Sequence, residues 1–317
     1  MYKKCFIVCW IGKFPEYFKY WERSCGNNLD YDFLIFTDQN YSPIYKNIVC
    51  IQKTIDDLKE LIEQRLDIKI DQLKPYKLCD FRPAFGIIFS EYIREYDFWG
   101  HCDIDQIFGK ISNFLTENIL EKSEKINKNG PFSLYRNNEK INNLYKKDGA
   151  KFSYKEVFST KENFAFDEFT GINMIVKKSN INLYLLNEYA DLDVKYKRLK
   201  MHNDINYKIQ TFLWEDEKIY RTFVSKDGKI IKEELMYLHF QKKNPDIKCK
   251  INDSKIMIGS NGFEKYSFID KETILKSNHY NGGVYENFEK VKYYINKMYK
   301  FIKCNKKQKQ IWIRQKI

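Results

Sequence analysis

The run KCFIVCWIG, residues 4–12, is an unbroken apolar segment of strand length that ends at a glycine. Apolar residues without alternation are typical of a strand that is buried on both faces. A helical pattern follows from Pro15 to Cys25, and the run DFLIFTD, residues 32–38, is a second apolar strand. Because strand, helix and strand follow one another directly, the sequence predicts a βαβ unit and a parallel sheet.

The same succession of elements continues along the chain. We expect further strands at residues 47–52, 96–105, 132–136, 171–177 and 236–240, helices from Thr54 onward and across 74–93, and a loop at 137–151. The predicted fold class is therefore α/β, with a mostly parallel central sheet flanked by helices and a helical, basic C-terminal extension. We expect one main domain at residues 1–245, divided near residue 110, and the extension at residues 246–317.

The composition is that of a globular chain of 317 residues, 43% of them hydrophobic, with a formal net charge of +12. No apolar run approaches the roughly 20 residues of a membrane span, and the N-terminus lacks a signal-peptide pattern, so we expect a cytoplasmic protein. Eight scattered cysteines without CxxC spacing favour reduced packing cysteines over disulfides or structural zinc. Lysine and asparagine are frequent while alanine, glycine and arginine are rare, which indicates a compositional bias of the genome, so the net charge is weak support for a nucleic-acid partner and we expect none.

The run FWGHCDID, residues 98–105, carries two aspartates directly after an apolar strand. In open α/β sheets ligands bind at the carboxyl ends of the strands, and a divalent cation neutralises the repulsion between Asp103 and Asp105. The sequence thus predicts a site for Mg²⁺ or Mn²⁺ and a diphosphate, with an exposed turn as the alternative. Two other Asp-x-Asp pairs are expected to be solvated, at residues 30–32, where a turn enters a strand, and at residues 191–193, in a polar segment.

Three linked runs carry a resemblance to a known family: KPYKLCDFRPAFG (74–86), FWGHCDIDQIFGKI (98–111) and MYLHFQKK (236–243). With the two opening strands, they resemble bacterial nucleotide-sugar glycosyltransferases of the GT-A type. The resemblance is greatest to capsule and lipopolysaccharide hexosyltransferases with an Asp-x-Asp motif and a late metal-binding histidine, and it covers roughly residues 1–245.

The resemblance implies a Rossmann-like GT-A fold and metal-dependent transfer of a hexose from a UDP-sugar to a saccharide acceptor in cell-surface polysaccharide synthesis. It implies Mn²⁺ or Mg²⁺ as cofactor, a nucleotide-sugar half at about residues 1–110 and an acceptor half at about 111–245. Many such enzymes close with a His-x-x-Gly-x-x-Lys-Pro pattern, whereas His239 is followed by Phe-Gln-Lys-Lys-Asn-Pro. The diphosphate contacts beyond His239 are therefore left open.

The resemblance also implies residue roles around the metal. Asp103 orients the ribose and the metal, Asp105 binds the metal directly, and His239 completes its coordination, unless His239 is a packed residue beside Phe240. Lys242 or Lys243 is expected to meet the diphosphate as a point charge.

On the donor side, the resemblance places two strand ends near the nucleotide. Thr37 and Asp38 meet the uridine or ribose, or else form a plain turn, and Trp10 and Gly12 belong to the same nucleotide contacts. The candidate donor clamp consists of Lys77, Asp80 and Arg82, although Lys77 and Asp80, three residues apart on a helix, also suit a surface ion pair.

The run FAFDEFTG, residues 164–171, sets acidic residues among aromatic ones. Asp167 or Glu168 is a candidate to deprotonate an acceptor hydroxyl or to contact the sugar, with a simple turn as the alternative. Phe166, Phe169 and Trp214 are expected to offer ring faces to a saccharide.

From Lys290 onward the chain has ten lysines and arginines and no acidic residue. Tyr294, Met298, Phe301 and Ile302 recur at helical spacing, so the tail suits an anionic membrane surface where lipid-linked glycan acceptors reside. The alternative is a helix packed on its own domain. Two other functions also stay open, a noncatalytic carbohydrate-binding protein and a metal-dependent nucleic-acid-binding protein or nuclease.

Overall fold

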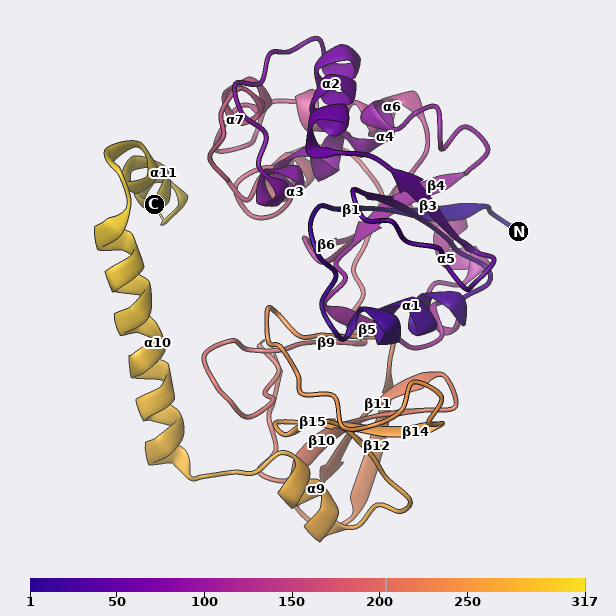
Figure 1. Cartoon of the computed structure of the whole chain (residues 1–317), viewed down its shortest axis with the longest axis vertical. Helices are drawn as coiled ribbons and strands as arrows, with labels where there is room; N and C mark the ends of the chain where they lie inside the picture. Colours follow the sequence, from indigo (N-terminus) through magenta and orange to yellow (C-terminus); the bar gives the residue numbers. More distant parts are fainter. Residues whose placement is uncertain (203, 317) are drawn as a thin grey trace.

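The computed structural model describes residues 1–202 and 204–316, and a seven-stranded sheet forms its centre (Figure 1). Its strand order is β3-β2-β1-β4-β7-β6-β8. The strands are β1 (Lys4–Trp10), β2 (Asp32–Thr37), β3 (Ile48–Gln52), β4 (Phe98–Cys102), β6 (Lys125–Asn129), β7 (Phe132–Arg136) and β8 (Leu183–Tyr184). Four neighbouring strands, β3, β2, β1 and β4, run parallel, whereas β7 is antiparallel to both β4 and β6. The predicted α/β class and mostly parallel sheet are confirmed.

Helices cover both faces of this sheet, as Figure 1 shows. On one face Phe18 and Trp21 of α1 (Phe18–Gly26) pack with Phe33 of β2, and on the other Leu58 and Ile62 of α2 (Ile55–Leu66) join a second core cluster. Helix α2 begins where the sequence predicted, because Thr54 and Asp57 form a reciprocal capping box.

A second, antiparallel sheet was not predicted. Its order is β12-β11-β10-β14-β15, formed by β10 (Gln210–Glu215), β11 (Lys218–Val224), β12 (Ile230–Leu235), β14 (Lys255–Gly259) and β15 (Gly262–Lys265). A small sheet of β5 (Gln106–Phe108), β13 (Tyr237–His239) and β9 (Tyr189–Asp191) lies between the two large ones. The five-stranded sheet takes strands from both sides of residue 245, where we expected the main domain to end.

Three segments differ from the prediction. The strand predicted at residues 171–177 is wrong, because this segment is helix α8 (Ile172–Lys178), with Ile172, Ile175 and Val176 buried on one face at helical spacing. The predicted loop at 137–151 contains α6 (Glu139–Asn142) and η4 (Leu144–Lys146), which bury Ile141 and Leu144.

The predicted helix at 74–93 is a series of short turns. These are η1 (Pro75–Lys77), α3 (Leu78–Phe81), η2 (Arg82–Ala84) and α4 (Phe85–Ile88). Pro83 has no N–H to continue a helical ladder, which accounts for the break at η2. Further short helices are η3 (Ile111–Asn113), α5 (Glu117–Lys122) and α7 (Tyr154–Phe158).

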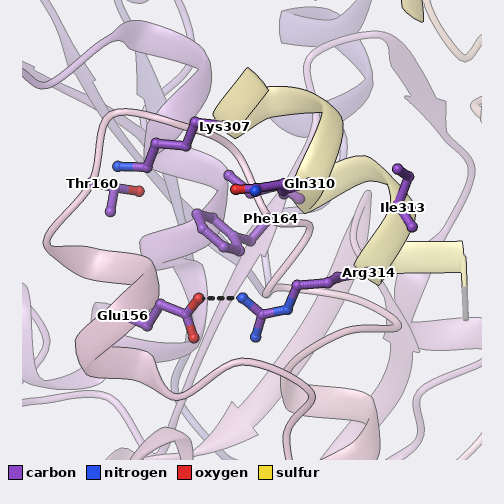
Figure 2. A pocket seen from close by; sticks show the side chains of 8 residues that line it. Glu156, Thr160, Phe164, Lys307, Gln310, Ile313 and Arg314 are labelled. Carbon is purple, nitrogen blue, oxygen red and sulfur yellow. Dashed lines mark hydrogen bonds and ion pairs between the residues drawn. The ribbon is translucent and has the colours of Figure 1, made fainter. Parts of the chain in front are cut away.

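The predicted extension at 246–317 is helical only after β15, where it forms α9 (Lys271–Ser277), α10 (Gly283–Lys303) and α11 (Lys306–Lys316). Helix α10 runs along one side of the molecule from near α9 toward α7 and buries no residue (Figure 1). Helix α11 returns to α7, where Ile311 is buried and Arg314 pairs with Glu156 across a cleft of about 520 Å³ (Figure 2).

Helix α11 packs on its own domain through Ile311, as one of the two alternatives expected, whereas α10 contacts the protein body mainly through the ion pairs of Glu286 with Arg198 and Lys200. Phe301, which we placed on the exposed stripe, contacts Trp312 of α11 with ring centroids 5.0 Å apart. Among the described residues, no helix has the length and apolar character needed to cross a membrane.

Candidate metal and donor site

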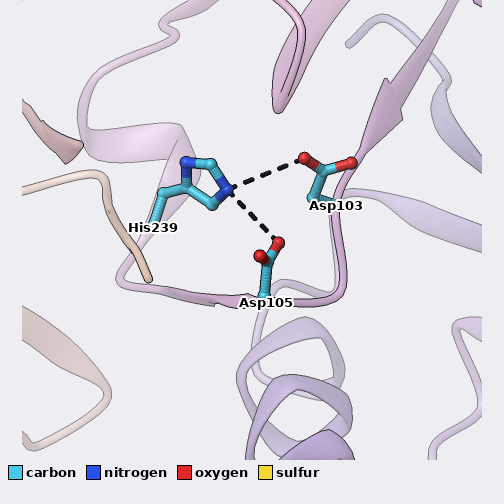
Figure 3. Close-up of side chains that lie close together, drawn as sticks. All are labelled: Asp103, Asp105 and His239. Carbon is cyan, nitrogen blue, oxygen red and sulfur yellow. Dashed lines mark ion pairs between the residues drawn. The ribbon is translucent and has the colours of Figure 1, made fainter. Parts of the chain in front are cut away.

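Asp103, Asp105 and His239 lie together, with one ligand atom of each within 4.8 Å of the others (Figure 3). The aspartates occupy the connection between β4 and β5, and His239 ends β13. Strand β13 pairs with β5, and the Phe240 N–H donates to the main-chain oxygen of Asp105 at 2.8 Å. This pairing joins positions far apart in the sequence, so that His239 Nε2 lies 3.2 Å from Asp105 Oδ1 and 3.7 Å from Asp103 Oδ2.

The electrostatics of this cluster favour a cation at its centre. Burial disfavours the charged imidazole of His239, but hydrogen bonds to Asp105 and Asp191 and the charge of Asp103 outweigh it and raise the pKa to about 10. Burial also opposes ionisation of Asp105, yet its hydrogen bonds to His239 and to the Lys242 N–H lower its pKa. Two carboxylates and an imidazole nitrogen are a donor set that suits Mn²⁺ or Mg²⁺, so the residues present fit the expected metal.

The other ring nitrogen of His239, Nδ1, is also hydrogen-bonded. His239 Nδ1–H donates to Asp191 Oδ1 at 2.7 Å, and Gln241 Nε2 donates to the other oxygen of Asp191 at 2.7 Å. The prediction of a solvated Asp191 is therefore wrong. Asp193, also predicted to be solvated, is buried and pairs with Lys195 at 2.9 Å.

Arg82 links Asp103 of this cluster to the predicted acid–base residues. Its guanidinium donates to the carboxylate of Asp103, to Asp167 Oδ2 at 3.1 Å and to the main-chain oxygen of Gly130 at 3.0 Å. Glu168 accepts from the N–H of the same Gly130 at 3.1 Å. Burial raises the pKa of both Asp167 and Glu168. The structure therefore brings Arg82, Asp103, Asp167 and Glu168 into one neighbourhood.

The ends of β1 and β2 meet as expected for adjacent parallel strands, with Trp10 opposite Thr37 in the register. The Gly12 N–H donates to Asp38 Oδ1 at 2.9 Å, and a hydrogen bond from Gln39 together with this one lowers the pKa of Asp38. Gly12 has φ +101°, and a side chain there would meet open space, so glycine is needed for the backbone conformation. Thr37 is buried.

Comparison with models of protein families shows which family the chain belongs to. Residues 6–267 match a family model described as "Family of unknown function (DUF6625)". This chain belongs to that family. No curated protein matches it.

Two solved structures of galactosyltransferase LgtC are similar to this DUF6625 chain at low levels. The complex with donor and acceptor sugar analogues has 11% sequence identity and a TM-score of 0.34, covering 59% of this chain and 75% of LgtC. An active-site mutant of LgtC has 11% identity and a TM-score of 0.38, covering 75% of this chain and 88% of LgtC. At these values neither similarity assigns a function.

Lys77 and Asp80 of this DUF6625 member do not form the expected surface pair or donor clamp. Their side chains are 1% and 0% exposed, and Lys77 Nζ donates to Asp80 at 2.8 Å and to the main-chain oxygens of Val157 and Glu162. Both oxygens of Asp80 accept main-chain N–H groups, from Phe164 and Phe166. The pair is a buried brace for the segment that leads to Asp167.

The expected saccharide-stacking aromatics are distributed differently. Phe166 and Trp214 are buried, and Trp214 packs under Arg23, so their ring faces are not available to a sugar. Phe169 is 54% exposed. Trp10 is half-buried and donates through Nε1 to the main-chain oxygen of Lys13 at 3.4 Å.

The two lysines after His239 have different environments. The Lys242 N–H donates to Asp105 Oδ2 at 2.8 Å, while its Nζ donates to the Tyr76 hydroxyl at 3.2 Å. Lys243 Nζ donates to the main-chain oxygen of Tyr196, on the other side of the turn. Lys242 has φ +66°, so a non-glycine residue adopts the left-handed conformation that this turn requires.

Proposed function

We propose that this chain is a GT-A type glycosyltransferase that moves a hexose from a UDP-sugar to a saccharide acceptor in cell-surface polysaccharide synthesis. The observation that carries the proposal is the Asp103–Asp105–His239 cluster at the carboxyl end of β4, the edge where open α/β sheets bind ligands. Its connection through Arg82 to Asp167 supports a reaction centre that includes both the metal ligands and an acidic group.

In this proposal Asp105 and His239 hold Mn²⁺ or Mg²⁺, and Asp103 orients the metal and the ribose. The metal ion, when bound, would neutralise the charge that develops on the departing diphosphate. Arg82 fixes the direction of the Asp103 and Asp167 carboxylates. Asp167 or Glu168 contacts the transferred sugar or takes the proton of the acceptor hydroxyl.

The donor nucleotide is proposed to lie across the ends of β1 and β2, against Trp10, Gly12, Thr37 and Asp38. The main-chain N–H of Lys242 binds Asp105, one of the proposed metal ligands. We therefore assign the diphosphate contact to Lys242 in preference to Lys243. The nucleotide-sugar half at about 1–110 and the acceptor half at about 111–245 are proposed on the same basis.

We further propose that the acceptor is a saccharide or lipid-linked glycan at the inner face of a membrane. The support is the basic C-terminal extension and the exposed apolar residues of α10. No nucleic-acid partner is part of this proposal.

The test is UDP release from a panel of UDP-sugars with and without Mn²⁺, for the wild-type chain, Asp105→Ala, His239→Ala and the exposed control Asp30→Ala. We expect metal-dependent release from the wild type and Asp30→Ala only, and at 100 times the dissociation constant UDP with Mn²⁺ should stabilise those two chains by about 2.7 kcal/mol. Full turnover by Asp105→Ala would contradict the proposed metal site. Binding of sugar without UDP release under any condition would instead indicate a noncatalytic carbohydrate-binding protein.

A further inference from the structure

Asp191 and His239 face each other across two paired strands. Strands β9 and β13 are parallel, with Asp191 directly opposite His239 in the register, and the Leu192 N–H donates to the main-chain oxygen of His239 at 3.0 Å. The two side chains are therefore held in position by the sheet, and their 2.7 Å hydrogen bond links two regular elements.

The hydrogen bond determines which imidazole nitrogen faces the two carboxylates of the cluster. With Nδ1–H donated to Asp191, Nε2 is directed to Asp103 and Asp105. A ligating imidazole must present a lone pair to the metal, and a carboxylate on its other nitrogen fixes both the tautomer and the ring orientation. Asp191 is outside the group of three whose ligand atoms converge, so its contact with a cation runs through the ring.

Gln241 in turn binds Asp191. Its side-chain amide donates to Asp191 Oδ2, the oxygen that His239 does not use. Gln241 has φ +49°, in the same left-handed turn as Lys242, whose N–H binds Asp105. In the turn after β13, Lys242 thus binds Asp105, and the preceding Gln241 binds Asp191, the partner of His239.

We propose that Asp191 is a positioning residue that presents Nε2 of His239 to the divalent cation, and that Gln241 in turn holds Asp191. This inference rests on the proposed metal site and adds to it a carboxylate–histidine–metal relay. Asp191, from the Asp-x-Asp at 191–193, thereby supports the Asp103–Asp105 pair. Partners of this kind typically contribute 10- to 100-fold to metal affinity.

The test measures the Mn²⁺ dissociation constant of the full-length chain, without nucleotide, from the electron paramagnetic resonance signal of free Mn²⁺. We expect Asp191→Ala to weaken binding by about 10- to 100-fold. Asp191→Asn should restore part of the affinity, because an amide oxygen still accepts from Nδ1–H. The control Asp193→Asn, two residues away and paired with Lys195, should bind Mn²⁺ as the wild type does.

A double-variant comparison separates positioning from simple charge. In a His239→Ala background, Asp191→Ala should cause no further loss of affinity, because the residue through which Asp191 acts is absent. An equal loss in both backgrounds, or an Asp191→Asn variant as weak as Asp191→Ala, would overturn the inference in favour of a bulk charge effect. Wild-type affinity in Asp191→Ala would overturn it as well.

Two further outcomes are distinguishable. If the wild-type chain binds no Mn²⁺, the proposed metal site and this inference both fail, whereas intact binding by Asp191→Ala removes the inference alone. If Asp191→Ala does not fold, Gln241→Ala tests the same relay. Weaker Mn²⁺ binding by Gln241→Ala would support the relay, and unchanged binding would overturn it.

Discussion

At the scale of single residues, Lys125 is a buried amine on β6, the strand next to the β8 edge of the main sheet. Its Nζ is 4.4 Å from the ring centroid of Tyr135 and 3.0 Å from Ser133 Oγ. Burial lowers the pKa of Lys125 to about 7. Because an unfolded lysine has a pKa near 10.4, the unfolded chain binds a proton between these two values that the folded chain does not.

This difference fixes the sign of a pH effect. Between pH 7 and about 10, Lys125 should make the free energy of unfolding rise by about 1.4 kcal/mol per pH unit. Lys125→Met cannot titrate, so its stability relative to the wild type should be highest at pH 7 and fall by about that amount per unit up to pH 9. Urea unfolding at pH 7, 8 and 9 measures this, with the exposed Lys128→Met as the matched control. Parallel pH profiles for Lys125→Met and the wild type would contradict the lowered pKa.

The candidate site shows which residues a sequence can predict. Asp103 and Asp105 were predictable because they follow a buried strand at the edge where ligands bind, and His239 because it ends a later apolar run. Asp191 was not, because its local sequence is that of a polar turn. Its partner is 48 residues away, and only the pairing of β9 with β13 gives it a role.

At the scale of elements, the ion pair between Lys77 and Asp80 braces one segment of the chain. Its hydrogen bonds join the η1–α3 turn to residues 157–166, immediately before Asp167. Helical spacing correctly predicted that the two side chains would pair. Burial of the pair depends on a segment some 80 residues later, which no local pattern encodes.

Removing one partner of this pair should destabilise the fold. Lys77→Met keeps most of the side-chain volume but leaves the Asp80 carboxylate and two carbonyls without their cation, which should cost about 3–5 kcal/mol. The comparison is with Lys74→Met, an exposed lysine just before η1. Urea unfolding of both variants measures the difference, and equal stabilities would show that the pair contributes nothing beyond its packing.

The elements were predicted best where apolar runs are continuous. The strands β1, β2 and β4 are buried on both faces or nearly so, and their continuous apolar runs make them easy to recognise in the sequence. Strand β12 of the antiparallel sheet was missed because it mixes charged and apolar residues, four of the six being exposed. Residues 171–177 were assigned to a strand on composition, although the buried residues recur at helical spacing.

At the scale of the whole molecule, α10 presents its apolar side to the outside. Successive apolar residues follow at steps of four and three, and each is 55–87% exposed: Val284, Phe288, Val291, Ile295, Met298 and Ile302. Glu286, two positions from both Val284 and Phe288, pairs with Arg198 and Lys200 of the protein body. Two positions along a helix turn the side chain by about 200°, so the apolar stripe points away from the body.

A membrane with anionic lipids has a negatively charged surface above an apolar interior, which suits an exposed apolar stripe flanked by lysines. We therefore expect α10 to lie on an anionic membrane. Replacing Phe288 and Ile295 with Glu should abolish binding to vesicles that contain anionic lipid. The control Ile44→Glu, at an exposed position of the first half, should bind as the wild type does. Vesicle cosedimentation measures both, and 1 M salt, where the Debye length is about 3 Å, should weaken the wild type as well.

The same variants distinguish a membrane from a second copy of the chain. If another copy covered the stripe, the wild type would run as a dimer in light scattering, and the two glutamates would convert it to a monomer without any vesicle binding to lose. A monomeric wild type that ignores anionic vesicles at low salt would contradict the membrane interpretation. Because the metal cluster and the strand ends assigned to the donor all precede residue 245, the glutamate variant should keep its Mn²⁺ affinity in either case. Loss of that affinity would instead show that α10, which α11 fastens to Glu156, helps to hold the two halves around the site.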